Sequence, residues 1–142
     1  MGDRSQDVPA RVLCVDDHRD TCEMLKVLFR ISGYDTVTAG TFAEALELAR
    51  RGGFDVAILD NRLPDGSGID LCRTLRTFDT RTPILFYSAA AYSEDAEAAF
   101  SAGANAYVTK PSNPTELVES IARLTQGRRP VVRTTGSGQQ SA

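Results

Sequence analysis

Lysine, histidine and cysteine are scarce in this chain. The 142 residues include one histidine and only two lysines, Lys26 and Lys110. The three cysteines contain no CxxC pair, which argues against a disulfide framework or a zinc site and fits a reducing compartment. No apolar run approaches the roughly 20 residues needed to cross a bilayer, and the N-terminus lacks the apolar core of a signal peptide. We therefore expect a cytoplasmic protein with no membrane partner.

Acidic residues slightly outnumber basic ones, and the balance differs between the two ends of the chain. The net charge is −3, and three arginines with no acidic residue follow position 126, so the first 126 residues carry −6. An acidic globule gives no support for direct binding of nucleic acid. We expect residues 1–10 to be a flexible segment, residues 11–126 to be a single domain, and the polar residues 127–142 to be a disordered tail or linker remnant.

Strand-like and helix-like segments alternate along the expected domain. Short apolar runs predict strands at 12–15, 36–39, 56–59, 83–87 and 106–109. Amphipathic patterns and caps predict helices at 19–31, 42–51, 68–78, 94–102 and 114–124. Five strand–helix pairs in this order predict an α/β fold with a doubly wound parallel sheet and helices on both faces.

Helix caps and apolar stripes support this assignment. Thr41 and Glu44 form a capping-box pattern in which each side chain would bond to the other's backbone amide. Ser67 is the expected cap of the third helix, whose apolar side would include Phe78. Asp65 is expected only to help make the turn before that helix.

Polar side chains follow four of the predicted strands at the same end. They are Asp16, Asp17, Asp60, Ser88 and Lys110. In such sheets the ligand site lies beyond the carboxyl ends of the strands, where the strand order reverses. We therefore expect these side chains to share one pocket.

The chemistry of this set is consistent with phosphoryl transfer. Three clustered carboxylates repel one another, so the site calls for a divalent cation or for a raised carboxyl pKa. Hard oxygen ligands favour Mg²⁺, and the hydroxyl and ammonium groups of Ser88 and Lys110 suit an anion. An Asp carboxylate is an established nucleophile toward phosphorus, and charge neutralisation stabilises the transfer. Pro111 leaves open whether the bond before it is cis or trans.

Four segments together resemble the receiver domains of two-component response regulators of the chemotaxis-regulator type. The segments are VLCVDD, ILDNRLPDGSG, FYSA and AYVTKP, and the resemblance extends over residues 11–126. It implies a flavodoxin-like (βα)5 fold with strand order 2-1-3-4-5. It also implies a phosphorylation-dependent switch rather than an enzyme, with only self-phosphorylation and autodephosphorylation activity.

The resemblance implies a role for each residue at the strand ends. Asp60 would accept the phosphoryl group, and Ser88 and Lys110 would contact its oxygens. Mg²⁺, or Mn²⁺, would be held by Asp17, by Asp60 and by the backbone carbonyl of Arg62. Asp16 would act on the ion through water.

The same resemblance implies how the switch works. Ala89 leaves room for the phosphate, and Tyr107 occupies the position of the family's switch aromatic. Phosphorylation would move Ser88 and Tyr107 and alter the surface of helix four, strand five and helix five. The donor would be a sensor histidine kinase or a histidine phosphotransfer protein, and the recipient of the signal a protein target or an output domain. Phosphorylation-linked dimerisation stays open.

Two residues near the expected pocket receive separate interpretations. His18, the only histidine, is interpreted as a residue at the entry of the first helix. Arg62 is placed near the mouth of the pocket, and we hypothesise that its side chain modulates the lifetime of the phosphoryl group.

Two alternatives to a stand-alone receiver remain. The chain could be a receiver excised from a hybrid histidine kinase or a DNA-binding regulator, although no output domain follows residue 126. A Mg²⁺-dependent phosphatase of the haloacid dehalogenase type also uses an Asp nucleophile. In those enzymes the nucleophile follows the first strand in an Asp-x-Asp pattern, whereas Asp16 and Asp17 are adjacent.

Overall fold

The structure is a computed structural model that describes residues 9–126. The expected tail at 127–142 and most of the expected flexible segment at 1–10 lie outside the described residues. The described elements, in chain order, are β1 (Arg11–Val15), α1 (Arg19–Ile31), β2 (Asp35–Ala39), α2 (Phe42–Arg51), β3 (Val56–Leu59), β4 (Arg62–Leu63), β5 (Gly66–Ser67), α3 (Gly68–Arg76), β6 (Ile84–Ser88), α4 (Ser93–Ala102), β7 (Ala106–Thr109) and α5 (Pro114–Leu124).

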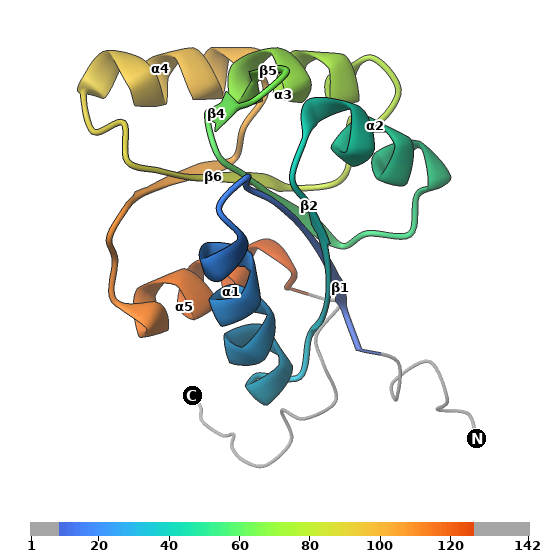
Figure 1. The fold of residues 1–142 in the computed structure, drawn as a ribbon, viewed down its shortest axis with the longest axis vertical. Helices are drawn as coiled ribbons and strands as arrows, with labels where there is room; N and C mark the ends of the chain where they lie inside the picture. The colour runs from blue at the N-terminus through green and yellow to red at the C-terminus, as the bar shows by residue number, and fades with distance from the viewer. Residues whose placement is uncertain (1–8, 127–142) are drawn as a thin grey trace.

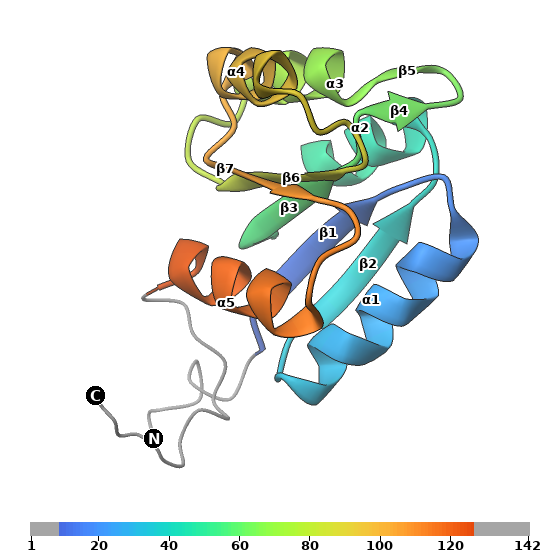
Figure 2. The ribbon, with the colours of Figure 1, turned by 90° about the vertical axis from the view of Figure 1, so that its left-hand side faces the viewer.

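Five of these strands form one parallel sheet in the order β2-β1-β3-β6-β7 (Figure 2). The remaining strands, β4 and β5, form a separate antiparallel hairpin. Without the hairpin, the sheet order reads 2-1-3-4-5, so the predicted doubly wound, flavodoxin-like fold is confirmed. The order reverses beside β1, which places the predicted site at the carboxyl end of β1 and β3.

Helices cover both faces of the sheet (Figure 1). Helices α1 and α5 pack on one face, and α2, α3 and α4 pack on the other. Alternate β1 residues supply the two apolar clusters, with Val12 and Cys14 on the α1 side and Leu13 and Val15 on the α2 side. Burial on both faces explains why this strand is a continuous apolar run. Within residues 9–126, none of the helices has both the length and the apolar character of a membrane span.

Several predicted element boundaries differ from the structure by one or two residues, and two of these differences change how a residue is interpreted. The strand predicted at 83–87 is β6, which includes Ser88, because Ser88 still pairs with Thr109 of β7. The third helix ends at Arg76, so the inward position predicted for Phe78 is wrong. Phe78 is 39% exposed, and the Arg50 guanidinium lies 4.8 Å from the centre of its ring. A cation from another helix thus covers an aromatic ring that the local pattern assigned to the core.

The N-terminus of α2 is capped by more residues than the sequence predicts. The Glu44 amide donates to Thr41 Oγ1 at 3.1 Å, as expected, but the Glu44 carboxylate accepts from the Gly40 amide rather than from Thr41. Asp65, at the tip of the β4–β5 hairpin, accepts from the amides of Phe42 at 2.7 Å and Ala43 at 3.1 Å. The interpretation of Asp65 as a turn residue alone is therefore incomplete. Its contact attaches the hairpin to α2 and satisfies amides that a helix start leaves free.

Candidate functional site

The backbone of the sheet holds the predicted site residues at one rim. The Asp16 amide donates to Ala39 O at 3.0 Å, and the Asp60 amide donates to Val15 O at 3.0 Å. The Lys110 amide donates to the carbonyl of Ser88 at 2.9 Å. Each residue is therefore fixed by the neighbouring strand, which limits how far its side chain can depart from the shared pocket.

An ammonium group lies between two buried carboxylates in this pocket. Asp16 and Asp60 are 4% and 6% exposed. Lys110 Nζ lies 2.7 Å from Asp16 Oδ2 and 3.4 Å from Asp60 Oδ2. Burial of Lys110 opposes its positive charge, but the hydrogen bonds and charges of the two carboxylates outweigh burial and raise the pKa of Lys110 above its usual value. The side chains that directly follow β1, β3 and β7 thus form one charged cluster.

The acidic cluster has the donor set of a cation site. One ligand atom from each of Asp16, Asp17, His18 and Asp60 lies within 4.8 Å of the other three. Carboxylate oxygens on a buried floor, with the exposed Asp17 at the rim, suit a hard divalent ion that keeps several water ligands. The residues present therefore fit Mg²⁺, or Mn²⁺, at this position.

His18 belongs to this cluster, which the sequence interpretation missed. His18 is the N-cap of α1, but its side chain makes no capping hydrogen bond. Its Nδ1 instead lies 3.0 Å from Asp16 Oδ1 and 3.3 Å from Asp17 Oδ1. The hydrogen bond to Asp16 and the two negative charges raise the pKa of His18. Its position directly after the acid pair was the available signal.

Ser88 and Tyr107 lie on the other side of the phosphoacceptor candidate. Ser88 is buried, and its Oγ accepts a hydrogen bond from the Ala90 amide at 3.2 Å. The Tyr107 hydroxyl donates to Ala90 O at 2.6 Å, and its ring stacks on Phe86 with centroids 5.9 Å apart. Burial raises the pKa of Tyr107. One loop residue, Ala90, therefore connects the hydroxyl candidate to the aromatic candidate.

A pocket of about 570 Å³ opens above these groups. Asp60, Ser88, Ala89 and Lys110 line it together with Arg62, whose side chain is exposed on β4. The predicted position of Arg62 near the mouth thus agrees with the structure. The Lys110–Pro111 peptide bond, whose isomer the sequence leaves open, is cis.

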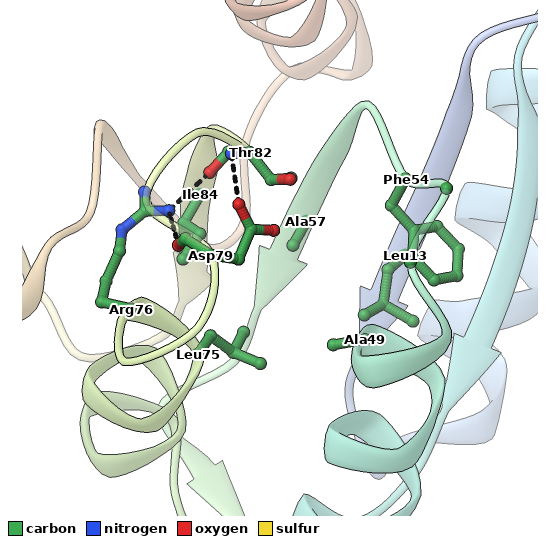
Figure 3. A pocket seen from close by; sticks show the side chains of 11 residues that line it. Leu13, Ala49, Phe54, Ala57, Leu75, Arg76, Asp79, Thr82 and Ile84 are labelled. Carbon is green, nitrogen blue, oxygen red and sulfur yellow. Dashed lines mark hydrogen bonds between the residues drawn. The ribbon is translucent and has the colours of Figure 1, made fainter.

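A second, smaller hollow lies at the amino ends of β3 and β6 (Figure 3). Its volume is about 30 Å³, which is room for only one or two waters. Apolar side chains such as Leu75 line it, and Arg76 closes one side by donating to the carbonyls of Asp79 and Thr82. This hollow is too small for a phosphoryl donor.

Comparison with known proteins identifies the family. Residues 12–122 match the model of the response regulator receiver domain, so the chain belongs to that family. The resemblance inferred from the four sequence segments is therefore confirmed. Members of this family serve as signalling components of two-component systems.

Several relatives are longer than this chain. It is 39% identical over 137 residues to the probable transcriptional regulatory protein TcrX of Mycobacterium tuberculosis, covering 96% of this chain and 58% of the relative. It is 40% identical over 115 residues to the DNA-binding response regulator MtrA of Mycolicibacterium smegmatis, covering 80% and 50%. The chain thus spans between half and three fifths of the length of these curated relatives.

Solved structures show the same fold. A CheY-like response regulator receiver domain protein from Methanospirillum hungatei superposes with a TM-score of 0.80 at 28% identity, covering 84% of this chain and 96% of that one. A putative response regulator from Chloroflexus aurantiacus gives a TM-score of 0.78 at 34% identity, covering 82% and 98%.

Proposed function

We propose that this chain is a signalling switch that accepts a phosphoryl group on Asp60 from a histidine of a sensor kinase or phosphotransfer protein. The observation that carries the proposal is the position of the Lys110 ammonium between the carboxylates of Asp16 and Asp60. Family membership supplies the signalling class, and this geometry supports the proposed roles of the three residues in the transfer.

Asp60 is the nucleophile in this proposal. One carboxylate oxygen attacks phosphorus, the bond from phosphorus to the donor nitrogen breaks, and an aspartyl phosphate results. Asp60 Oδ1 already accepts a hydrogen bond from the Asn61 amide at 2.8 Å. That bond fixes the orientation of the carboxylate and leaves Oδ2 directed toward Lys110.

Lys110 and Ser88 stabilise the transferred group. The ammonium, 3.4 Å from Asp60 Oδ2, lies within reach of phosphoryl oxygens attached to that carboxylate. A buried positive charge offsets the charge that the transferred group brings. The Ser88 hydroxyl accepts from the Ala90 amide, and rotation of this side chain would direct its proton to a phosphoryl oxygen.

The acidic residues hold the divalent cation. Asp17, Asp60 and the Arg62 carbonyl are the proposed ligands, and Asp16 acts through a water ligand. When bound, Mg²⁺ or Mn²⁺ neutralises charge on the reacting oxygens. Lys110 keeps Asp16 and Asp60 close together before the ion binds.

The change of surface follows from the link between Ser88 and Tyr107. If Ser88 turns toward a phosphoryl oxygen, Ala90 loses its hydrogen-bond acceptor, and the same residue holds the Tyr107 hydroxyl. We propose that this rearrangement of Ala90 and Tyr107 changes the surface formed by α4, β7 and α5. A protein target, an output domain or a second copy of the chain binds there. The buried, free cysteines support residence in the reducing cytoplasm.

Arg62 is proposed to set the lifetime of the aspartyl phosphate. Its exposed side chain lines the pocket, where its charge either screens the phosphate or steers attacking water. Dephosphorylation rates of the native protein and Arg62→Ala test this, and equal rates would end the hypothesis.

A receiver that forms part of a longer DNA-binding regulator is the second candidate. It is favoured by the relatives, which are named as transcriptional or DNA-binding regulators and of which this chain spans only 50–58%. In that case DNA binding would belong to the rest of the protein, and the acidic domain would remain the switch. The length of the intact gene product separates the two candidates.

Incubation with Mg²⁺ and a small acyl phosphate, followed by intact-mass measurement, tests the proposed chemistry. We expect one phosphoryl group on the native protein and none on Asp60→Asn. Equal labelling of both proteins would refute the assignment of Asp60. Turnover of a generic phosphate ester would instead favour the phosphatase alternative.

A further inference from the structure

Two thiols face each other directly beneath the acidic loop. Cys14 lies on β1 and Cys22 on the inward side of α1, and both belong to the same apolar cluster. The interaction with the other thiol is the largest cause of the raised pKa of Cys14 and of the lowered pKa of Cys22. The seven residues between them include Asp16 and Asp17. The absence of CxxC argued against paired cysteines in the sequence. That motif detects only cysteines that are close together along the chain, and Cys14 and Cys22 are eight positions apart.

The thiol pair is also attached to the backbone of the acidic loop. Cys22 Sγ donates to the carbonyl oxygen of Asp16 at 3.3 Å. Only a reduced Cys22 carries the proton for this bond, so its redox state bears on a carbonyl in the loop that holds the cation. Cys72 provides a contrast, because it lies in the other apolar cluster and donates to Ala102 O.

We propose that Cys14 and Cys22 are a peroxide-sensitive pair whose oxidation to a disulfide weakens cation binding by the acidic cluster. The formation of the disulfide is independent of the proposed function. The effect on the cation rests on it, because it takes the acidic cluster to be the metal site.

The oxidation balances with one molecule of hydrogen peroxide. Cys22 is 7% exposed and Cys14 only 1%, so Cys22 meets the oxidant first. Its sulfur attacks a peroxide oxygen, the O–O bond breaks, and a sulfenic acid and one water form. The Cys14 sulfur then attacks the Cys22 sulfur, the S–O bond breaks, and the departing hydroxide takes the Cys14 proton as a second water. The two thiols lose two electrons, and the peroxide gains them.

The disulfide changes the acidic loop in two ways. The Asp16 carbonyl loses its thiol donor, since neither sulfur of a disulfide carries a proton. The S–S bond also joins α1 covalently to β1 at the two ends of the loop. Asp16 and Asp17 lie inside the ring that this bond closes. Loss of a supporting hydrogen bond behind a metal site costs about tenfold in affinity at the lower end of the observed range.

The test uses the full chain before and after treatment with hydrogen peroxide. Free thiols are alkylated and the protein is digested with trypsin, which places Cys14 in peptide 12–19, Cys22 in peptide 20–26 and Cys72 in peptide 63–73. Mn²⁺ binding is measured by electron paramagnetic resonance on the same samples. Cys72→Ala is the matched control, and Cys14→Ala and Cys22→Ala remove the pair.

We expect peptides 12–19 and 20–26 to become linked in the native protein and in Cys72→Ala. Mn²⁺ binding should weaken about tenfold on oxidation and recover with dithiothreitol. The proposal is overturned if both thiols remain free to alkylation, if Cys22 gains oxygen without a crosslink, or if the disulfide leaves Mn²⁺ affinity unchanged. Reduced protein that binds no Mn²⁺ also overturns it. Reduced protein that binds Mn²⁺ but is not labelled on Asp60 refutes the proposed function and leaves this inference standing.

Discussion

Gly68, the first residue of α3, is where added volume should damage the site most directly. A Cβ at this position would lie 2.1 Å from the carbonyl oxygen of Asp60, 2.9 Å from its carbon and 3.0 Å from the Asn61 Cα. All three are backbone atoms, so no change of rotamer relieves the overlap. To reach even 3.0 Å, α3 and the Asp60 backbone must separate by about 0.9 Å.

Two opposing effects set the size of the change in Gly68→Ala. Alanine in a helix is favoured over glycine by about 1 kcal/mol. Overpacking against fixed atoms costs about 3 kcal/mol at the upper end of the usual range, and the separation also threatens the 2.8 Å bond from the Gly68 amide to Asn61 O. We expect a net loss of about 2 kcal/mol in the free energy of unfolding, together with weaker labelling of Asp60.

Urea unfolding followed by far-ultraviolet circular dichroism measures this loss. Gly40→Ala is the matched control, because a Cβ there meets only Asp16 O, at 4.0 Å. We expect that control to stay within about 0.5 kcal/mol of the native protein. If Gly68→Ala is as stable as the native protein or more so, the reasoning from backbone contact is wrong.

Three further substitutions test the charge and hydrogen-bond arguments. Lys110→Ala leaves Asp16 and Asp60 facing each other without the ammonium group. In the absence of divalent ions, the free energy of unfolding should therefore fall by about 3 kcal/mol, and Mg²⁺ should restore part of this loss. Equal losses with and without Mg²⁺ would contradict the argument. Arg76→Ala removes donors to three backbone carbonyls and should cost about 2 kcal/mol in urea unfolding, whereas a loss below about 0.5 kcal/mol would refute its role. The hydrogen bond from the Phe42 amide lowers the pKa of Asp65 in the folded protein. The ionised Asp65 carboxylate therefore stabilises the fold above the unfolded pKa of 3.8, and this stabilisation is lost as the pH falls through the lower folded pKa. The advantage of the native protein over Asp65→Asn in urea unfolding should therefore shrink below pH 3.8, and a constant difference across pH would count against the contact.

Local patterns were sufficient for the fold class because strands and helices leave periodic signals. The run from Val12 to Val15 is apolar throughout since both faces of β1 are covered. The strand-end rule also predicts Asp16, Asp60 and Lys110 at one rim of the sheet, because parallel strands end at a common edge.

Contacts between distant segments left no such signal. Asp65 matches a turn in the sequence, and only the packing of the hairpin on α2 shows it as a cap. Phe78 fits the apolar stripe of α3, but the helix ends before it and Arg50 comes from another element. The contact of His18 with the acid pair depends on the direction of its side chain, which residue spacing does not specify.

The order of residues along the chain alone determined which elements form and at which edge of the sheet the reactive side chains gather, because periodicity and strand direction are local properties. Only the tertiary structure decided which groups touch there: the ammonium of Lys110 bridging two carboxylates, and the thiols of Cys14 and Cys22 meeting beneath them. Those contacts join separate elements, and their geometry follows from how helices pack on the sheet.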